Sequence, residues 1–263
     1  MEMDFHTLRA MLEWQIDLGV TEAFAELPVN RYDAVVSVAV AVAAASTPVL
    51  NPPQGAFAGP EAGRDPVATA RGLAAGAADL GALRAAMAAF EGCELKKGAR
   101  NLVFADGNPQ ARVMVIGEAP GREEDMQGLP FVGAAGQMLD RMFAAIGLAR
   151  GAATRDTAIY ITNILPWRPP QNRDPSAEEI AMLMPFVERH VALVDPEVIV
   201  LMGNIACAGL LGVRGITRLR GRWAEALGRP VLPMFHPAYL LREPVQKREA
   251  WADLLALQAR LRG

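Results

Sequence analysis

Four short apolar segments, each ending in a polar or Gly/Pro-rich turn, constrain the fold of this chain more than any other feature of its sequence. They cover residues 112–116, 158–161, 198–202 and 230–235. Stretches with a helical pattern separate them, at residues 136–146, 177–194 and 205–211. Apolar strands that alternate with helices are typical of a mostly parallel sheet covered by helices on both faces. The sequence therefore predicts an α/β fold.

The chain divides by composition into three regions. Apolar residues at helical spacing predict a helical N-terminal appendage over residues 1–45. Residues 46–66 are rich in Pro, Gly and Ala, which is typical of a linker. An Ala/Leu-rich pattern over residues 67–90 predicts one helix, and with it begins the domain of residues 67–263 that holds the strands.

Charge and cysteine usage narrow the classes of function. The net charge of −3 argues against a uniformly basic nucleic-acid binder, but residues 214–248 hold eight Lys and Arg against Glu225 and Glu243. Such a stretch is either a solvated face or a surface for phosphates. Two cysteines, Cys93 and Cys207, predict neither a disulfide framework nor a metal site. With no basic leader or span-length apolar run, we expect a soluble cytoplasmic protein without a membrane partner.

Polar side chains stand just after each of the four predicted strands. They are Glu118, Asn163, Gly203–Asn204 and His236. In a parallel sheet the ligand site lies beyond the carboxyl ends of the strands. A carboxylate, an amide and an imidazole are therefore expected to converge at one edge of the sheet, as they do in active sites.

Two of these residues, together with Phe131 on the loop after the first strand, suit the recognition of a flat base, although each also has a structural explanation. Asn163 offers a planar amide that matches a pyrimidine edge with an imide N–H and a carbonyl, or it caps a turn. Phe131, framed by Pro130 and Gly133, can stack on a base or lie in the core. His236 can donate to a carbonyl oxygen that gains negative charge, or it is a structural histidine.

Two further segments carry the same double interpretation. Gly117–Gly121 reads GEAPG, which forms either a plain strand-to-helix turn or a turn whose backbone N–H groups face a ligand beside Glu118. Tyr239, Leu240 and Leu241 are large apolar groups on a predicted loop followed by Arg242. They either pack against a helix start or form a wedge that fills the gap left by an extruded base.

Taken together and in order, these motifs resemble family 4 uracil-DNA glycosylases over residues 88–258. The resemblance rests on GEAPGREED at 117–125, PFVGAAGQMLD at 130–140, YITNILPWRPPQNRDP at 160–175, VIVLMG at 198–203, RGRW at 220–223 and HPAYLLR at 236–242. It implies a three-layer α/β/α fold with a central four-stranded parallel sheet.

The resemblance also implies a role for particular residues. The implied catalytic residues are Glu118, His236 and Asp125. The implied uracil-binding residues are Gly117, Ala119, Phe131 and Asn163. The implied DNA-binding residues are Arg168, Arg173, Tyr239, Leu240 and Arg242.

One departure from the family concerns its cofactor. Family 4 enzymes usually hold a [4Fe–4S] cluster on four cysteines. Aligned on the surrounding motifs, those positions fall at Phe90, Cys93, Trp167 and Leu183, so three of the four ligands are absent. We therefore expect a branch of the family without the cluster, with no cofactor and no metal, in which apolar packing ties these segments together.

The expected function is hydrolytic removal of uracil from DNA after base flipping, by a monomer acting on single- or double-stranded DNA. An alternative is a damage-binding module that grips uracil or abasic DNA with little turnover. Glu118, Asn163 and His236 favour the enzyme, because a binding module has less need of the acid and the imidazole. A hydrolase of free nucleotides or bases is a third possibility, but it needs neither the basic stretch nor the apolar residues 239–241.

Overall fold

The computed structural model describes residues 65–263, so the predictions for residues 1–45 and for nearly all of the linker lie outside it. Its centre is a six-stranded sheet of order β1-β3-β2-β4-β6-β5. The strands are β1 (Asp106–Gly107), β2 (Val113–Gly117), β3 (Ile159–Asn163), β4 (Val198–Met202), β5 (Ala224–Ala226) and β6 (Arg229–Met234). Strands β3, β2, β4 and β6 run parallel, which confirms the predicted core of the sheet, and β1 and β5 add short antiparallel edges.

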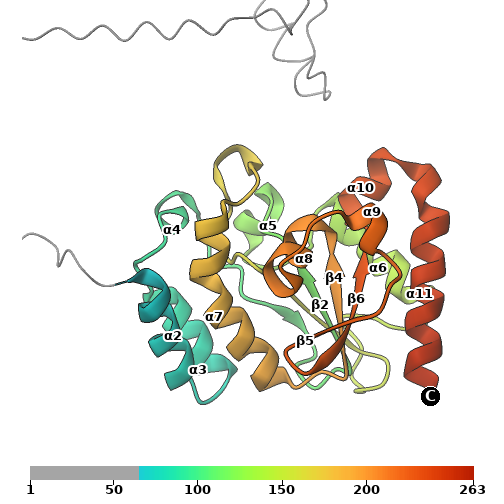
Figure 1. Cartoon of the computed structure of the whole chain (residues 1–263), viewed down its shortest axis with the longest axis horizontal. Coiled ribbons are helices and arrows are strands. Elements are labelled where there is room, and N and C mark those ends of the chain that lie inside the picture. Colours follow the sequence, from blue (N-terminus) through green and yellow to red (C-terminus); the bar gives the residue numbers. More distant parts are fainter. Residues whose placement is uncertain (1–64) are drawn as a thin grey trace, which may run out of the picture. The chain divides into compact units, whose positions relative to one another are not determined.

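The helices lie on both sides of this sheet, as predicted (Figure 1). They are α2 (Pro66–Gly76), α3 (Leu80–Ala89), α4 (Leu95–Gly98), α5 (Arg122–Gln127), α6 (Ala134–Ala144), α7 (Ala177–Val194), α8 (Gly203–Leu211), α9 (Ile216–Leu219), α10 (Pro237–Arg242) and α11 (Lys247–Arg262), with short 3-10 turns η1 (Pro170–Asn172) and η2 (Pro244–Gln246). Within residues 65–263, no helix is both long enough and apolar enough to span a bilayer.

The first two of these helices correct the prediction of one helix over residues 67–90. The Asp79 carboxylate accepts a hydrogen bond from the Ala82 N–H at 2.7 Å and so begins a new helix, α3, after α2 has ended. Asp65 caps α2 in the same manner, and Pro66 stands in its first turn. The last two residues of the predicted linker therefore belong to the folded domain.

Successive side chains of each parallel strand point to opposite faces of the sheet. On β2, Met114 and Ile116 join one apolar cluster, while Val113 and Val115 join the other. The first cluster lies under α2, α3, α7 and α8, and the second lies under α6, α10 and α11. Because the parallel strands are buried on both faces, their sequences read as continuous apolar runs, which is the pattern that predicted them.

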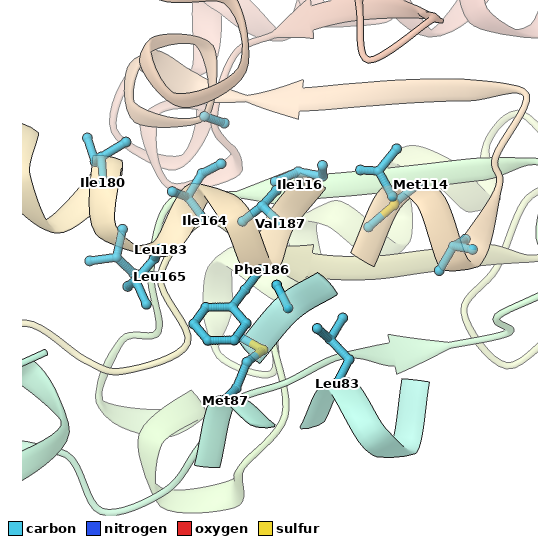
Figure 2. Close-up of a cluster of buried hydrophobic side chains, with 14 of the residues drawn as sticks. Leu83, Met87, Met114, Ile116, Ile164, Leu165, Ile180, Leu183, Phe186 and Val187 are labelled. Carbon is cyan, nitrogen blue, oxygen red and sulfur yellow. The ribbon is translucent and has the colours of Figure 1, made fainter. Parts of the chain in front are cut away.

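Helix α7 is the main anchor of the first cluster. Ser176 and Glu179 form a reciprocal capping box at its start, which explains why its bounds match the sequence pattern. Figure 2 shows Phe186 of α7 beside Leu83 and Met87 of α3. Its ring also meets the edge of Phe90 with centroids 5.5 Å apart. One aromatic ring thus joins α7 to α3 and to the segment that comes after it.

Replacing this ring tests how much of the fold depends on that contact. Phe186 is fully buried, so we expect Phe186→Ala to lower the free energy of unfolding by about 3–5 kcal/mol, measured by chemical denaturation. Val245→Ala is the control, because Val245 is 84% exposed and its loss should change stability by less than about 0.5 kcal/mol. Equal effects of the two substitutions would contradict this role for Phe186.

Candidate active site

A cavity of about 640 Å³ opens at the carboxyl ends of the parallel strands. Each parallel strand contributes to it through a residue at its end or just beyond: Glu118 after β2, Asn163 at the end of β3, Gly203 and Asn204 after β4, and His236 after β6. The structure therefore brings together the polar residues that the strand pattern placed at one edge. Phe131 and Ala119 also line the cavity.

The floor of the cavity depends on the pairing of β2 with β3. Gly117 lies directly opposite Asn163 in the parallel register. A Cβ on Gly117 would come within 2.4 Å of Asn163 Oδ1 and 2.5 Å of the Phe131 ring, so only glycine fits at this position. Gly117 therefore shapes the cavity by its missing side chain, and the amide and the aromatic ring meet above it.

Asn163 holds an unpaired hydrogen-bond acceptor in this position. Its side chain is buried, and its Oδ1 has no hydrogen-bond partner among residues 65–263. An unpaired buried acceptor costs free energy that a folded protein rarely leaves uncompensated. Because Asn163 lines the cavity, a ligand with an N–H group would satisfy that atom.

His236 is held as a neutral donor. Its Nδ1 accepts a hydrogen bond from the Ala238 N–H at 3.1 Å as the side chain caps α10. Burial, with Arg242 as a second cause, lowers the pKa of His236 to about 4, although Glu124 opposes the shift. The imidazole is therefore uncharged at neutral pH, and its one proton sits on Nε2, where it can be donated.

Glu118 has the opposite shift. Burial raises the pKa of Glu118 to about 7, and the negative charge of Asp174 adds to that effect while Arg214 reduces it. A carboxyl group that titrates near neutral pH inside a cavity is suited to exchange a proton or to change charge during a reaction. Among the carboxylates that line the cavity, this makes Glu118 the strongest candidate for a chemical role.

Phe131 is positioned by its own turn. It has a φ of 53°, which is unusual for a bulky residue, and its ring lies 5.5 Å from that of His236. Glu124 Oε1 accepts hydrogen bonds from the Val132 and Gly133 N–H groups, both at 2.9 Å, and so fixes the adjoining backbone. The sequence analysis did not single out Glu124, because its contacts are formed with residues that lie eight and nine positions away.

Two predicted site residues lie elsewhere. Asp125 does not line the cavity: its carboxylate accepts hydrogen bonds from the Arg100 and Asn101 N–H groups at 2.8 and 3.2 Å. It joins α5 to the segment after α4, a structural contact that lies outside the cavity. Leu240 is fully buried in the second apolar cluster, so its side chain does not lie on the surface of the described residues. The predicted loop at 239–241 is the helix α10, which turns adjacent side chains in different directions.

The remaining predicted DNA-binding residues lie at or near the rim. Tyr239 and Arg242, on α10, line the cavity. Arg173 also lines it, although Glu179 holds its guanidinium through two hydrogen bonds of 2.6 and 2.8 Å. Arg168 Nε donates to Asn172 Oδ1 at 2.8 Å.

The segment between β3 and α7 supplies cavity residues that the sequence analysis did not identify, namely Asn172 and Asp174. Gln171 and Asn172 both have positive φ values, of 55° and 53°. Strained backbone of this kind gathers at ligand sites. The tandem prolines Pro169 and Pro170 before it are the signal in the sequence that marks an irregular segment here.

A doubly covered parallel sheet with a cavity at its carboxyl edge, lined by an amide, an aromatic ring and a neutral histidine, defines an α/β protein with a site suited to planar polar ligands. Comparison with known proteins makes this class specific. Residues 104–255 match the model of the uracil DNA glycosylase superfamily, which is more than half of the chain. The chain therefore belongs to that superfamily.

Curated relatives agree with this assignment. A protein from Archaeoglobus fulgidus named as a type-4 uracil-DNA glycosylase is 38% identical over 172 residues, which cover 61% of this chain and 82% of the relative. A type-4 uracil-DNA glycosylase from Thermotoga maritima is 38% identical over 153 residues, or 57% and 77% of the two chains. One from Pyrobaculum aerophilum is 34% identical over 177 residues, or 62% and 84%.

The state of Glu118 can be tested through stability. The unfolded chain ionises this carboxyl group near its ordinary pKa of 4.5, whereas the folded protein does so at about 7. Between these values the folded state binds more protons, so the wild-type free energy of unfolding should fall relative to Glu118→Gln as pH rises from 4.5 to about 7. Denaturation at a series of pH values measures this, and parallel profiles for the two proteins would contradict the raised pKa.

Proposed function

We propose that this protein removes uracil from DNA by hydrolysis of the N-glycosidic bond, as an early step in the repair of deaminated cytosine. The observation that carries this proposal is the unpaired Oδ1 of Asn163, which lies above Gly117 and beside Phe131 in a cavity of about 640 Å³. Uracil presents an imide N–H to such an acceptor, whereas cytosine has an unprotonated ring nitrogen at the same position.

Access to the base requires that the nucleotide leaves the duplex. Extrusion costs a few kcal/mol, and less for a mismatched base. Arg242 at the rim of the cavity and Arg214 near Glu118 bring positive charge to the place where phosphates would lie. The ring of Phe131 provides a flat surface for the flipped base.

His236 stabilises the departing base. As the glycosidic bond breaks, negative charge builds on the uracil carbonyl oxygens and positive charge builds on the sugar. The Nε2–H of the neutral imidazole donates to the O2 of uracil, an interaction that becomes stronger in the transition state than in the ground state. Because Nδ1 is engaged by the Ala238 N–H, the donor stays on the correct nitrogen.

Glu118 acts on the sugar side of the reaction. Its ionised carboxylate orients the attacking water and balances the cationic character of the sugar. Its pKa of about 7 places the change from the neutral to the ionised form in the neutral range. Cleavage is accordingly faster on the alkaline side of this pKa. The products are free uracil and an abasic site.

Single-turnover cleavage of an oligonucleotide with one deoxyuridine, followed by alkali, tests this function. His236→Ala should lower the rate by about 10²–10³ fold, as loss of an oxyanion donor does. Asn163→Ala should lower it by about 10- to 100-fold, through loss of the hydrogen bonds that hold uracil. Asn108→Ala is the matched control, because Asn108 lies just after β1 and does not line the cavity.

The same experiment separates the enzyme from a damage-binding module. A wild-type protein that binds uracil or abasic DNA tightly without cleaving it would overturn the enzymatic proposal. Cleavage that is equally fast in the His236 variant, the Asn163 variant and the control would place the reaction outside this cavity.

We also propose that the protein holds no iron–sulfur cluster. The residues at the family's ligand positions, Phe90, Cys93, Trp167 and Leu183, are all nearly or fully buried within the first apolar cluster. Figure 2 shows Leu183 among the apolar side chains of that cluster. A single thiol, whose pKa is raised by burial, cannot supply the four thiolates that a [4Fe–4S] cluster requires. The residues present thus do not fit the cluster.

Iron analysis and the visible spectrum of protein purified from iron-supplemented cells test this proposal. We expect a colourless protein without stoichiometric iron, and we expect Cys93→Ala to cleave uracil-containing DNA at the wild-type rate. A brown protein that loses its colour and its iron in Cys93→Ala would show that a cluster is bound after all.

A further inference from the structure

The backbone conformation of Phe131 needs an external support. A φ of 53° is strained for a side chain of this size, and such a conformation persists only where its surroundings enforce it. The ring direction depends on this backbone, and with it the position of the surface that faces the base. Whatever holds the peptide of Phe131 therefore also sets the shape of the cavity.

Arg150 holds that peptide. Its Nη2 donates to the Phe131 carbonyl oxygen at 2.7 Å, and its Nη1 donates to the Pro130 carbonyl oxygen at 3.0 Å. Gly136 leaves room for this arrangement, because a Cβ there would lie 1.7 Å from the Phe131 oxygen. One planar guanidinium thus donates hydrogen bonds to two successive backbone carbonyl groups.

Two carboxylates fix the guanidinium in turn. Arg150 Nη1 donates to Asp106 on β1 at 2.9 Å, and Nε donates to Asp140 on α6 at 2.8 Å. The Arg150 side chain is only 18% exposed, so solvent screens these pairs less than it would on an open surface. A lysine cannot reproduce this set of contacts, because it lacks the fixed fork of donors.

We propose that Arg150 is a positioning residue for the uracil site: it acts on the reaction only through Phe131. Arg150 itself does not line the cavity. This inference rests on the proposed function. Through Arg150, the edge strand β1 and helix α6 are connected to the aromatic ring that faces the base.

A double-mutant cycle tests the link. Arg150→Met should lower the single-turnover rate of uracil removal by about 10- to 100-fold, the scale of a misplaced positioning group. Phe131→Ala removes the ring that Arg150 positions. In that background, Arg150→Met should change the rate by less than about twofold, because residues that act through one another are not additive.

Arg112→Met is the matched control. Like Arg150, Arg112 donates to a carboxylate, that of Glu197, and to a backbone carbonyl oxygen, that of Leu261. It stands before the start of β2, whereas the cavity lies beyond the end of this strand. It should leave the cleavage rate unchanged. Arg150→Lys keeps the charge without the fork and should be as slow as Arg150→Met. If Arg150→Met does not fold, Arg150→Lys takes its place in the cycle.

Several outcomes would overturn this inference. Rate losses that are the same with and without the Phe131 ring would show that Arg150 acts by another route. A fully active Arg150→Lys would show that charge alone suffices. The ring's position can also be monitored by ¹⁹F NMR of protein labelled with fluorophenylalanine: the Phe131 signal should shift in Arg150→Met and not in Arg112→Met. That readout holds even if the wild-type protein fails to cleave DNA, which would overturn the proposed function alone.

Discussion

The parallel pairing of β2 with β3 is the constraint on which the rest of the site depends. It sets Gly117 opposite Asn163, and the β3 chain continues this contact as the Ile164 and Leu165 N–H groups donate to the Gly117 and Glu118 carbonyl oxygens at 3.0 Å. A slip of one residue would turn Asn163 away from the cavity, since side chains alternate along a strand. The buried apolar side chains on both faces of these strands prevent that slip.

Three groups that each cost stability lie around this pairing. An unpaired amide oxygen, a bulky residue with positive φ and a carboxyl group with a raised pKa all line one cavity. Each costs stability in the absence of a ligand. The tightly packed sheet and the hydrogen bonds of Glu124 and Arg150 hold these groups in place. A site arranged in advance in this way needs little reorganisation when the base enters.

Periodicity in the sequence supported the most reliable predictions. The parallel strands, helix α7 and the residues just after each strand were predicted because burial on two faces of the sheet and on one face of a helix leaves clear periodic patterns. The edge strand β5 left no such pattern because it is short and mostly exposed. Asp125 and Leu240 were misplaced for a related reason: a family motif marks a segment, whereas the short helices α5 and α10 decide which of its side chains face the cavity. The role of Arg150 could not be predicted from the sequence, because its hydrogen-bond partners lie 10 to 44 residues away along the chain.

The departure at the family's cluster positions fits this same architecture. Trp167 is buried in the first apolar cluster between Leu165, which ends the contact with β2, and Arg168 near the rim. Its burial holds the start of the cavity wall at 168–174 against the apolar cluster to which α3 and α7 also contribute. Thiolate ligation to iron is one way to hold such segments together, and dispersion with the hydrophobic effect is another. Packing of this kind acts over many weak contacts, so no single bond controls it. Asn163 lies only four residues before Trp167, so the apolar cluster and the proposed uracil site are joined by one short buried segment.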